Sequence, residues 1–268
     1  MRGKEYYRAI TEYRRFLFSF PHDARRSMVH FRIGLAFYRG MDYGKAWEVF
    51  DEVAELYPGT PYGKQAWLWQ GECLMQQGNY EAAQALYGDV SQHLPEEGFG
   101  EHATYRHAWA LLRQQEWQKA AERLQSIPIH NSFRETAQRV AEAILDNGDF
   151  SRKSPLLAGV LSATLPGSGQ LYIGRQGDAL LAFVLNGLFV VGIIEALNHD
   201  QVAIAGILGL FEAGWYAGGI YGAINGAHKR NRYRAETFIR ELEDRFRYHP
   251  LEFPPTVRTF GIRLSLRF

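Results

Sequence analysis

Residues 67–95 read WLWQGECLMQQGNYEAAQALYGDVSQHLP, which is two helical patterns joined at Gln77–Tyr80 and closed by Pro95. The small positions of this stretch recur 37 residues before and after it, the Tyr87 position recurs as Phe50 and Leu124, and the proline recurs before it. The recurring sets are Gly34, Gly71 and Ala108; Ala9, Ala46, Ala83 and Ala120; Tyr13, Phe50, Tyr87 and Leu124; and Pro21, Pro58 and Pro95. Because a single helix pair would leave an apolar face uncovered, this period predicts a stack of pairs.

The repeated unit resembles the tetratricopeptide repeat, in which a small residue among aromatics on one helix precedes Ala, an aromatic and Pro on the next. One copy is carried by Trp67, Gly71, Ala83, Tyr87 and Pro95, and another by Gly34, Phe37, Ala46, Phe50 and Pro58. We expect Gly71 and Ala83 to let paired helices approach, and Tyr87 to fill the gap to the next pair. Pro95 ends the helix because it has no N–H. The resemblance implies a repeat domain over residues 1–150.

The first copy of the repeat contains only its second helix, at residues 4–18. A lone second helix would expose an apolar face, which costs about 25 cal/mol per Å². We therefore expect the natural protein to continue upstream of Met1, in a part that could hold the partner helix and could also hold an export signal. An array that starts with a lone helix is the alternative.

A groove lined by the first helix of each pair is the candidate binding site of such an array. Alignment from the Gly or Ala position turns eight side chains toward it: Phe31, Leu35, Tyr38, Leu68, Met75, Tyr105, Trp109 and Arg113. Exposed aromatic side chains together with Arg are enriched in protein interfaces. We predict that a protein or peptide binds here; the alternative is that several of these side chains only pack between neighbouring helices.

Two strongly apolar segments follow, at residues 179–197 and 202–226, with the polar link Asn198–Gln201 between them. A helix needs about 20 residues to cross a hydrocarbon core of about 30 Å. The segments therefore predict a transmembrane hairpin within a membrane domain at 154–234; a buried soluble hairpin is the alternative. The apolar stretch 155–165 is too short to span and predicts a re-entrant helix.

Glycine recurs at every fourth position of the second segment. The stripe consists of Gly214, Gly218, Gly222 and Gly226. Small residues in this pattern let helices pack closely in lipid. We expect the stripe to contact the first segment near Asn186, or a second copy in a homo-oligomer. Glu212 and Glu195 are the carboxylates of the spans, and Glu212 is a candidate for a proton or ion role.

The loop before the hairpin, residues 166–175, reads PGSGQLYIGR. This string, together with NGAHKRNRY at 225–233, resembles small bacterial membrane domains in which the loop joins a short apolar helix to a hairpin. The loop lacks the G-K-[ST] ending of a phosphate loop. We expect it to lie at the membrane surface and to contact headgroups, with Pro166, Gly167, Gly169, Gln170 and Tyr172 forming the interface loop and Arg175 following it. Association with that group suggests a role in envelope or membrane-protein assembly.

Basic residues predict the topology of the hairpin. Arg152, Lys153, Arg175 and the cluster at 229–234 flank one side, whereas the link 198–201 has no Lys or Arg. The positive-inside rule then places the repeats in the cytoplasm, at a bacterial inner membrane. A missing export signal would place them in the periplasm. A basic run beside a span favours anionic lipid over nucleic acid as its partner.

A third segment, residues 235–268, is expected to hold an amphipathic helix and a tail. Phe238, Leu242 and Phe246 share one face of a helix at about 232–247, and Phe253-Pro254-Pro255 follows it. Apolar and polar residues then alternate from Phe260 to Phe268. Alternation is typical of a strand, so we expect an edge strand or a partner-binding tail.

Composition and motifs give no sign of catalysis. The chain has 30 basic and 29 acidic residues, and its single Cys73 excludes an internal disulfide and predicts a buried thiol. His102 and His107 lack a metal-binding pattern, and we expect no cofactor and no metal. The sequence thus predicts an all-α protein that is not an enzyme: a helical-repeat solenoid, then a transmembrane hairpin. The predicted function is a membrane-anchored scaffold for a protein partner; the alternative is an oligomeric small channel or transport component regulated by its repeats.

Overall fold

The computed structural model describes residues 2–94, 98–128, 134–147 and 152–246, and every regular element in these ranges is an α-helix. The all-α fold class is confirmed. The helices are α1 (Arg2–Ser19), α2 (Arg26–Arg39), α3 (Tyr43–Leu56), α4 (Pro61–Gln76), α5 (Tyr80–His93), α6 (Phe99–Arg113), α7 (Trp117–Gln125), α8 (Arg134–Asn147), α9 (Pro155–Thr164), α10 (Ser168–Tyr172), α11 (Gln176–Asn198) and α12 (Val202–Arg245). The tail expected to form a strand at 260–268 lies outside the described residues.

The chain divides into two compact units. The repeat unit spans residues 1–148 and resumes at Glu241, and the hairpin unit spans residues 149–240. The end of α12 therefore belongs to the repeat unit. The second apolar segment and the amphipathic helix expected after it form one continuous helix, α12.

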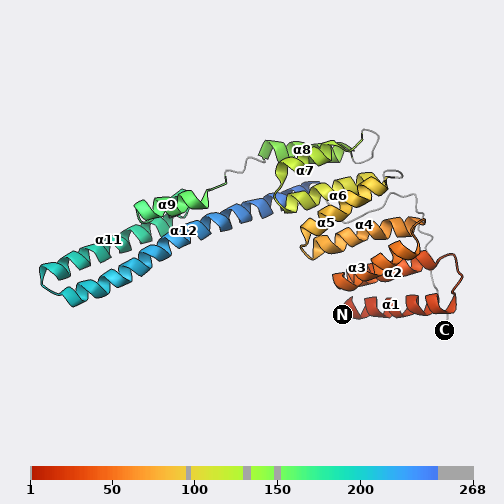
Figure 1. Ribbon diagram of the computed structural model, residues 1–268, viewed down its shortest axis with the longest axis horizontal. Coiled ribbons are helices and arrows are strands. Elements are labelled where there is room, and N and C mark those ends of the chain that lie inside the picture. Colours follow the sequence, from red (N-terminus) through yellow and green to blue (C-terminus); the bar gives the residue numbers. More distant parts are fainter. Residues whose placement is uncertain (1, 95–97, 129–133, 148–151, 247–268) are drawn as a thin grey trace. The chain divides into compact units, whose positions relative to one another are not determined.

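Within the repeat unit, α1 to α8 pack in chain order, each against the next (Figure 1). In two of the helix pairs, a glycine allows the two helices to pack closely. A Cβ at Gly34 would lie 2.5 Å from Cε1 of Phe50, and one at Gly71 would lie 2.4 Å from Cε1 of Tyr87. The prediction that small residues let the paired helices approach is confirmed. Tyr87 was expected to fill the gap to the next pair. Its ring lies against Gly71 of its own pair.

The turns within the pairs are closed by side-chain caps. Asp42 accepts a hydrogen bond from the backbone N–H of Lys45 at the start of α3, and Asn79 accepts one from Ala82 at the start of α5. Such caps satisfy N–H groups that have no partner inside the helix. Gly78 has a φ of +76°, a conformation that costs glycine little.

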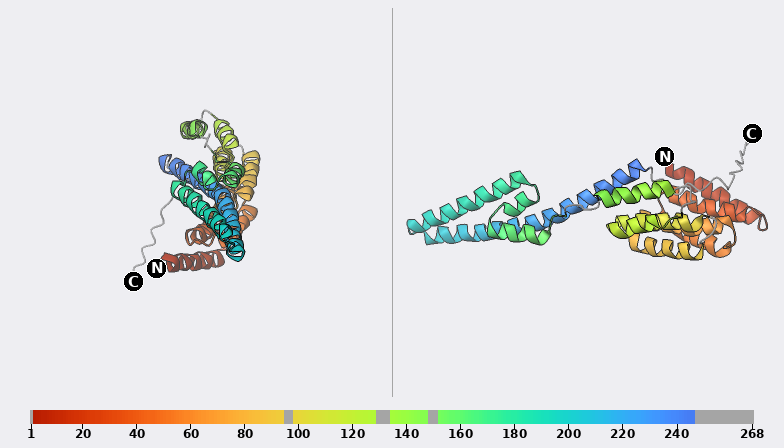
Figure 2. Two further views of the ribbon diagram at one scale, coloured as in Figure 1. Left: turned by 90° about the vertical axis from the view of Figure 1, so that its left-hand side faces the viewer. Right: turned by 90° about the horizontal axis from the view of Figure 1, so that it is seen from above.

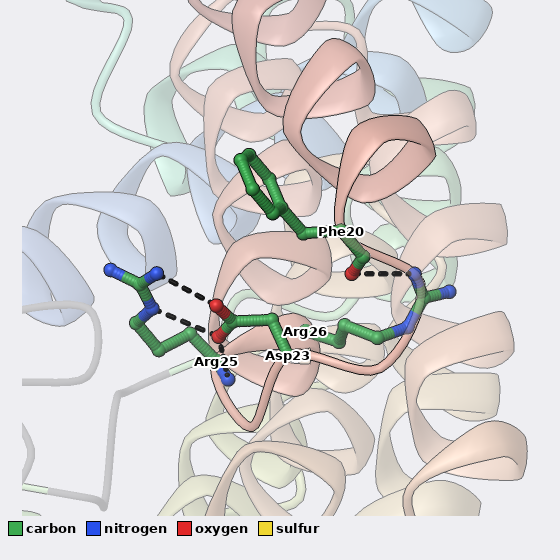
Figure 3. Close-up of polar contacts among 4 residues, drawn as sticks. All are labelled: Phe20, Asp23, Arg25 and Arg26. Carbon is green, nitrogen blue, oxygen red and sulfur yellow. Dashed lines mark hydrogen bonds and ion pairs between the residues drawn. The ribbon is translucent and has the colours of Figure 1, made fainter.

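The connection between α1 and α2 is fixed by a local ion pair (Figure 3). The Asp23 carboxylate accepts hydrogen bonds from Nη2 and Nε of Arg25, at 2.7 and 2.9 Å, and from the Arg25 backbone N–H at 2.8 Å. These bonds lower the pKa of Asp23 to about 2. Arg26 donates to the carbonyl oxygen of Leu17 at 2.8 Å, which ties the start of α2 to the end of α1.

In the hairpin unit, α11 and α12 run antiparallel and are joined at residues 199–201, with α9 beside α12 (Figures 1 and 2). Contact between α9 and α12 is close, because a Cβ at Gly159 would lie 2.8 Å from Cγ1 of Ile224. The hydroxyl of Tyr216 on α12 donates to the carbonyl oxygen of Ala163 at 2.8 Å. The short helix before the hairpin is thus a packed part of this unit.

Candidate functional site

The first helices of the pairs, α2, α4 and α6, form a continuous layer, because α4 contacts both α2 and α6. Three of the eight side chains expected in the groove are buried in this layer: Phe31 is 4% exposed, and Leu68 and Trp109 are fully covered. The Phe31 ring lies 5.3 Å from Phe50 and 5.7 Å from Tyr62, centroid to centroid. Their assignment to a partner-facing groove is wrong, because successive pairs stack closely enough to enclose them.

Five of the expected groove residues remain partly accessible: Leu35, Tyr38, Met75, Tyr105 and Arg113. The Tyr38 ring packs edge-on against Trp69, with 4.9 Å between centroids, which holds it in place. Burial, together with the nearby Glu72 carboxylate, raises the pKa of Tyr38. Its hydroxyl therefore stays protonated and can donate a hydrogen bond. We call these five residues the repeat face.

Arg113 at one end of the repeat face already has a partner in its own unit. Its Nη2 forms an ion pair with Oε1 of Glu243, in the last turns of α12, and the neighbouring Leu242 is 2% exposed. The repeat pattern predicted Arg113 in the groove but gave no sign of its pairing with Glu243. A ligand that uses Arg113 would have to share it with this carboxylate.

A buried ion pair joins two successive repeats and was missed by sequence analysis. Glu72 on α4 is 1% exposed and Arg106 on α6 is 4% exposed, with Oε1 and Nη1 3.3 Å apart. The Tyr87 hydroxyl donates to the same Glu72 oxygen at 2.8 Å. Charged side chains are almost never buried unless paired. One sequence feature could have indicated the burial of Glu72: it directly follows Gly71, which marks the inward side of its helix.

Burial holds three titratable groups of the repeat unit, His102, His107 and Cys73, in their neutral forms. Burial lowers the pKa of His102 and of His107 to about 4, with smaller contributions from Arg106 and Arg123 respectively. Cys73 is fully buried, as expected, and burial raises the pKa of its thiol to about 12. The Cys73 thiol is therefore protonated at neutral pH. In the described ranges, no group of three or more His, Cys, Asp or Glu side chains could hold a metal ion.

Family models match the repeat unit in two overlapping ranges. A tetratricopeptide repeat-like domain matches residues 36–149, and a tetratricopeptide repeat matches residues 2–61. This chain is a tetratricopeptide-repeat protein. No curated protein and no solved structure matches it significantly. Tetratricopeptide repeats serve as scaffolds for protein–protein interaction, so the repeat face is the first candidate for a binding surface in this tetratricopeptide-repeat protein.

Its hairpin unit holds two helices that are long and apolar enough to cross a membrane. Helix α11 has 23 residues and a mean hydropathy of 2.3 over its most apolar window, and the corresponding window of α12 reaches 1.3. Only 11% and 6% of these windows are buried within the structure. Large apolar side chains consequently lie exposed along α11, among them Leu180, Phe183, Leu188, Val191 and Ile194.

Glycines of the interface loop are required by close backbone contacts. Gly167 has a φ of +91°, and a Cβ there would lie 2.2 Å from the carbonyl oxygen of Ala179. A Cβ at Gly169 would lie 2.1 Å from the carbonyl oxygen of Ala158. No larger residue fits at either position without backbone movement. The loop therefore packs α10 tightly against both α9 and α11.

Gln170 of the interface loop was expected to contact lipid headgroups. It is instead buried within the hairpin unit. Its Nε2 donates to the carbonyl oxygen of Gly219 at 2.8 Å, and its Oε1 accepts from the Ser162 hydroxyl at 3.0 Å. It thus links α9 to α12 through α10. The Tyr172 hydroxyl accepts a hydrogen bond from the Ser154 backbone N–H at 3.1 Å. Pro166 is half-buried beside these contacts.

Most of the glycine stripe does not pack against α11, which was one of the two partners expected for it. Apart from its chain neighbours and the adjacent backbone of α12, a Cβ built at Gly214, Gly218 or Gly222 would have no atom of the described residues within 4 Å. These three glycines instead line a cavity of about 640 Å³ between α11 and α12. Gly226 differs, because a Cβ there would lie 2.5 Å from Cδ1 of Ile173. The stripe therefore has two parts, one open and one packed.

The polar side chains of the spans have separate environments. Asn186 is 5% exposed, and its Nδ2 donates to the carbonyl oxygen of Ala182 within α11. Glu195 lies close to the end of α11, is exposed, and pairs with His199 at 3.0 Å. Glu212 is half-buried on α12. Within the described part of the chain, the two carboxylates therefore share no contact with Asn186.

Proposed function

We propose that this protein is a membrane-anchored scaffold: the hairpin unit holds it in a bilayer and the repeat face binds a protein or peptide. The observation that carries the anchoring is the exposure of the apolar side chains on α11 and α12. Large exposed apolar patches mark contact with a membrane or another protein. Helix α11, with 23 residues, is about 35 Å long, which exceeds a hydrocarbon core of about 30 Å.

The repeat face supports binding of an extended, partly apolar segment. Leu35 and Met75 supply half-buried apolar contacts, and Tyr38 and Tyr105 supply rigid aromatic rings with a polar end. Tyrosine and arginine dominate binding energy in many interfaces. Because the layer of first helices is continuous, a ligand could contact two or three repeats at once. Envelope or membrane-protein assembly remains the process in which we place this scaffold.

The contacts of the hairpin unit favour one orientation of its ends. Lys153 exchanges two backbone-to-amide hydrogen bonds with Asn231, and Arg230 donates to the carbonyl oxygen of Ile173. These basic residues therefore gather at the end of the hairpin opposite the link 199–201. The positive-inside rule then favours a cytoplasmic location for the repeats at a bacterial inner membrane.

The alternative, an oligomeric channel or transport component, has weaker support. An ion pathway would need polar side chains along one face of the spans. The cavity between α11 and α12 is lined mainly by apolar residues, with Gln170, Arg175 and Asp178 at one end. This mainly apolar lining agrees better with the role of a membrane-anchored scaffold.

Two measurements on the full-length chain test the proposal. Extraction of membranes with carbonate at high pH should leave the protein in the pellet; its release would overturn the anchoring. A photocrosslinking residue at Leu35 or Met75 should capture one discrete partner in native membranes, whereas the exposed second-helix positions Glu81 and Lys119 should not. Equal capture from all four positions would overturn the repeat face as the binding surface.

Protease digestion tests the orientation separately. In intact spheroplasts, a cytoplasmic repeat unit should resist added protease and become sensitive once the membrane is opened. Digestion of the repeats in intact spheroplasts would place them on the outer side of the membrane and overturn the orientation, but not the anchoring.

A further inference from the structure

The cavity between α11 and α12 is an unusual feature for two helices joined by a short link. Figure 2 shows the two helices meeting at the link and separating toward the beginning of α11. The separation leaves a partly open space of about 640 Å³. One wall is the bare glycine stripe at Gly214, Gly218 and Gly222, and the facing wall includes Ala182 and Phe189.

Such a space does not stay empty in a bilayer. A void deprives the atoms that line it of dispersion contacts on one side. Because its walls are mainly apolar, the cavity suits hydrocarbon better than water. The lateral neighbours of a membrane hairpin are lipid chains, which are as apolar as leucine.

The length of the cavity matches one leaflet. Its lining on α12 runs from Leu210 to Gly222, which is about 18 Å at 1.5 Å per residue. Half of a hydrocarbon core of about 30 Å is about 15 Å. The two lengths differ by only about 3 Å, so one extended acyl chain that fills the cavity would end close to the midplane.

The polar end of the cavity carries positive charge. Arg175 lines it, and Asp178 pairs with Nε of the guanidinium, which leaves the Nη atoms for a ligand. Lys153 lies over the Tyr172 ring at 4.4 Å, at this same end. Residues 152–178 and 226–234 together contain seven Lys or Arg residues against the single Asp178. This charge complements a phosphate group.

We propose that the cavity binds one acyl chain of an anionic phospholipid, with the lipid phosphate at Arg175. The proposal rests on the membrane anchoring argued above. Gly218 provides the space for the chain, and Gln170 closes the polar end. The protein then holds a specific lipid between its spans, in the leaflet on the side of the basic residues.

Trp215 lines the cavity and gives a direct readout. It is the single Trp of the hairpin unit among the six of the chain. Full-length protein is reconstituted in phosphatidylcholine vesicles with a minor fraction of either dibrominated phosphatidylglycerol or dibrominated phosphatidylcholine. Bromine quenches the fluorescence of nearby tryptophan. A Trp215→Phe variant gives the fluorescence of the other five Trp residues, which is subtracted to obtain the quenching of Trp215. We expect stronger quenching of Trp215 by the brominated phosphatidylglycerol at equal mole fraction.

Matched variants separate the cavity from its charge. Gly218→Leu fills the cavity and should abolish the preference, whereas Gly187→Leu, at an exposed glycine of α11 outside the cavity, should preserve it. Arg175→Gln should make quenching of Trp215 by the two brominated lipids equal. Arg232→Gln, in the neighbouring basic cluster, should leave the stronger quenching by phosphatidylglycerol unchanged.

Each contrary outcome has its own meaning. Equal quenching by the two lipids in the native protein overturns the anionic site. A native preference that survives in Gly218→Leu, accompanied by altered crosslinking between subunits, overturns the cavity as the lipid site and assigns the stripe to a second copy. Absence of Trp215 quenching by either lipid, together with release by carbonate, overturns the membrane anchoring itself.

Discussion

Removal of Arg106 should destabilise the repeat unit far more than loss of an ordinary surface arginine. The Arg106→Met variant keeps the bulk of the buried stem but leaves the Glu72 carboxylate, 1% exposed, without its ion-pair partner. Breaking one side of a buried ion pair costs about 3–5 kcal/mol. The Tyr87 hydroxyl still donates to Glu72, so we expect the lower part of that range. Arg139→Met, at an exposed arginine of α8, should change the free energy of unfolding by less than about 0.5 kcal/mol.

The double variant Glu72→Gln with Arg106→Met makes this test specific. The glutamine side chain is neutral and can still accept the hydrogen bond from Tyr87, so the uncompensated charge disappears. We expect the double variant to recover about 1–3 kcal/mol relative to Arg106→Met, as interacting neighbours do. Urea unfolding of the detergent-solubilised full chain, followed by tryptophan fluorescence, measures this, because five of the six Trp residues lie in the repeats. If the change in the free energy of unfolding of the double variant equals the sum of the changes for Glu72→Gln and Arg106→Met alone, the pairing is refuted.

Three further predictions concern close packing, pH and the interface loop. Gly71→Ala should lower the free energy of unfolding of the repeat unit by about 1–3 kcal/mol, because its methyl group would meet the buried Tyr87 ring. Gly44→Ala, with open space around it, should raise that free energy by about 0.5–1 kcal/mol; equal effects in urea unfolding would contradict the close contact. The pKa values of His102 and His107 are about 4 in the folded protein and about 6.5 in the unfolded chain, so the unfolded chain binds more protons between these values. Stability of the repeats should therefore fall as pH drops from about 7 to about 4, and His107→Gln should flatten that slope while the exposed His22→Gln does not. Gln170→Leu should weaken the hairpin unit by about 1–3 kcal/mol because it leaves buried polar groups unpaired; faster proteolysis of the loop than in the exposed Gln176→Leu variant measures this.

Much of the repeat architecture could be predicted because its signals are local. Gly34 and Gly71 mark the points of closest helix contact, since only glycine lacks a Cβ there, and Asp42 and Asn79 sit where helix caps are needed. The apolar length of α11 likewise follows directly from composition. Each of these signals depends on a few neighbouring residues and not on how distant segments meet.

The parts that could not be predicted depend on how closely separate helices pack. The 37-residue period indicates which side of a helix faces inward, but not that stacking is tight enough to bury Phe31, Leu68 and Trp109. A charged residue such as Arg106 also reads as a surface residue until its partner from another repeat is known. The glycine stripe has the same difficulty, because spacing along one helix does not show whether its bare face meets a neighbour or a cavity.

The double hydrogen bond of Gln170 has an evolutionary consequence. Its amide joins a hydroxyl at Ser162, eight residues upstream, to a backbone carbonyl at Gly219 on α12. Natural variants that replace this glutamine with an apolar residue should also replace Ser162, because the lone hydroxyl would otherwise lose its acceptor. Substitutions at the two positions should therefore be correlated across homologous chains. Gly169 should be invariant whichever pair is present, because a Cβ there would lie 2.1 Å from the backbone carbonyl oxygen of Ala158.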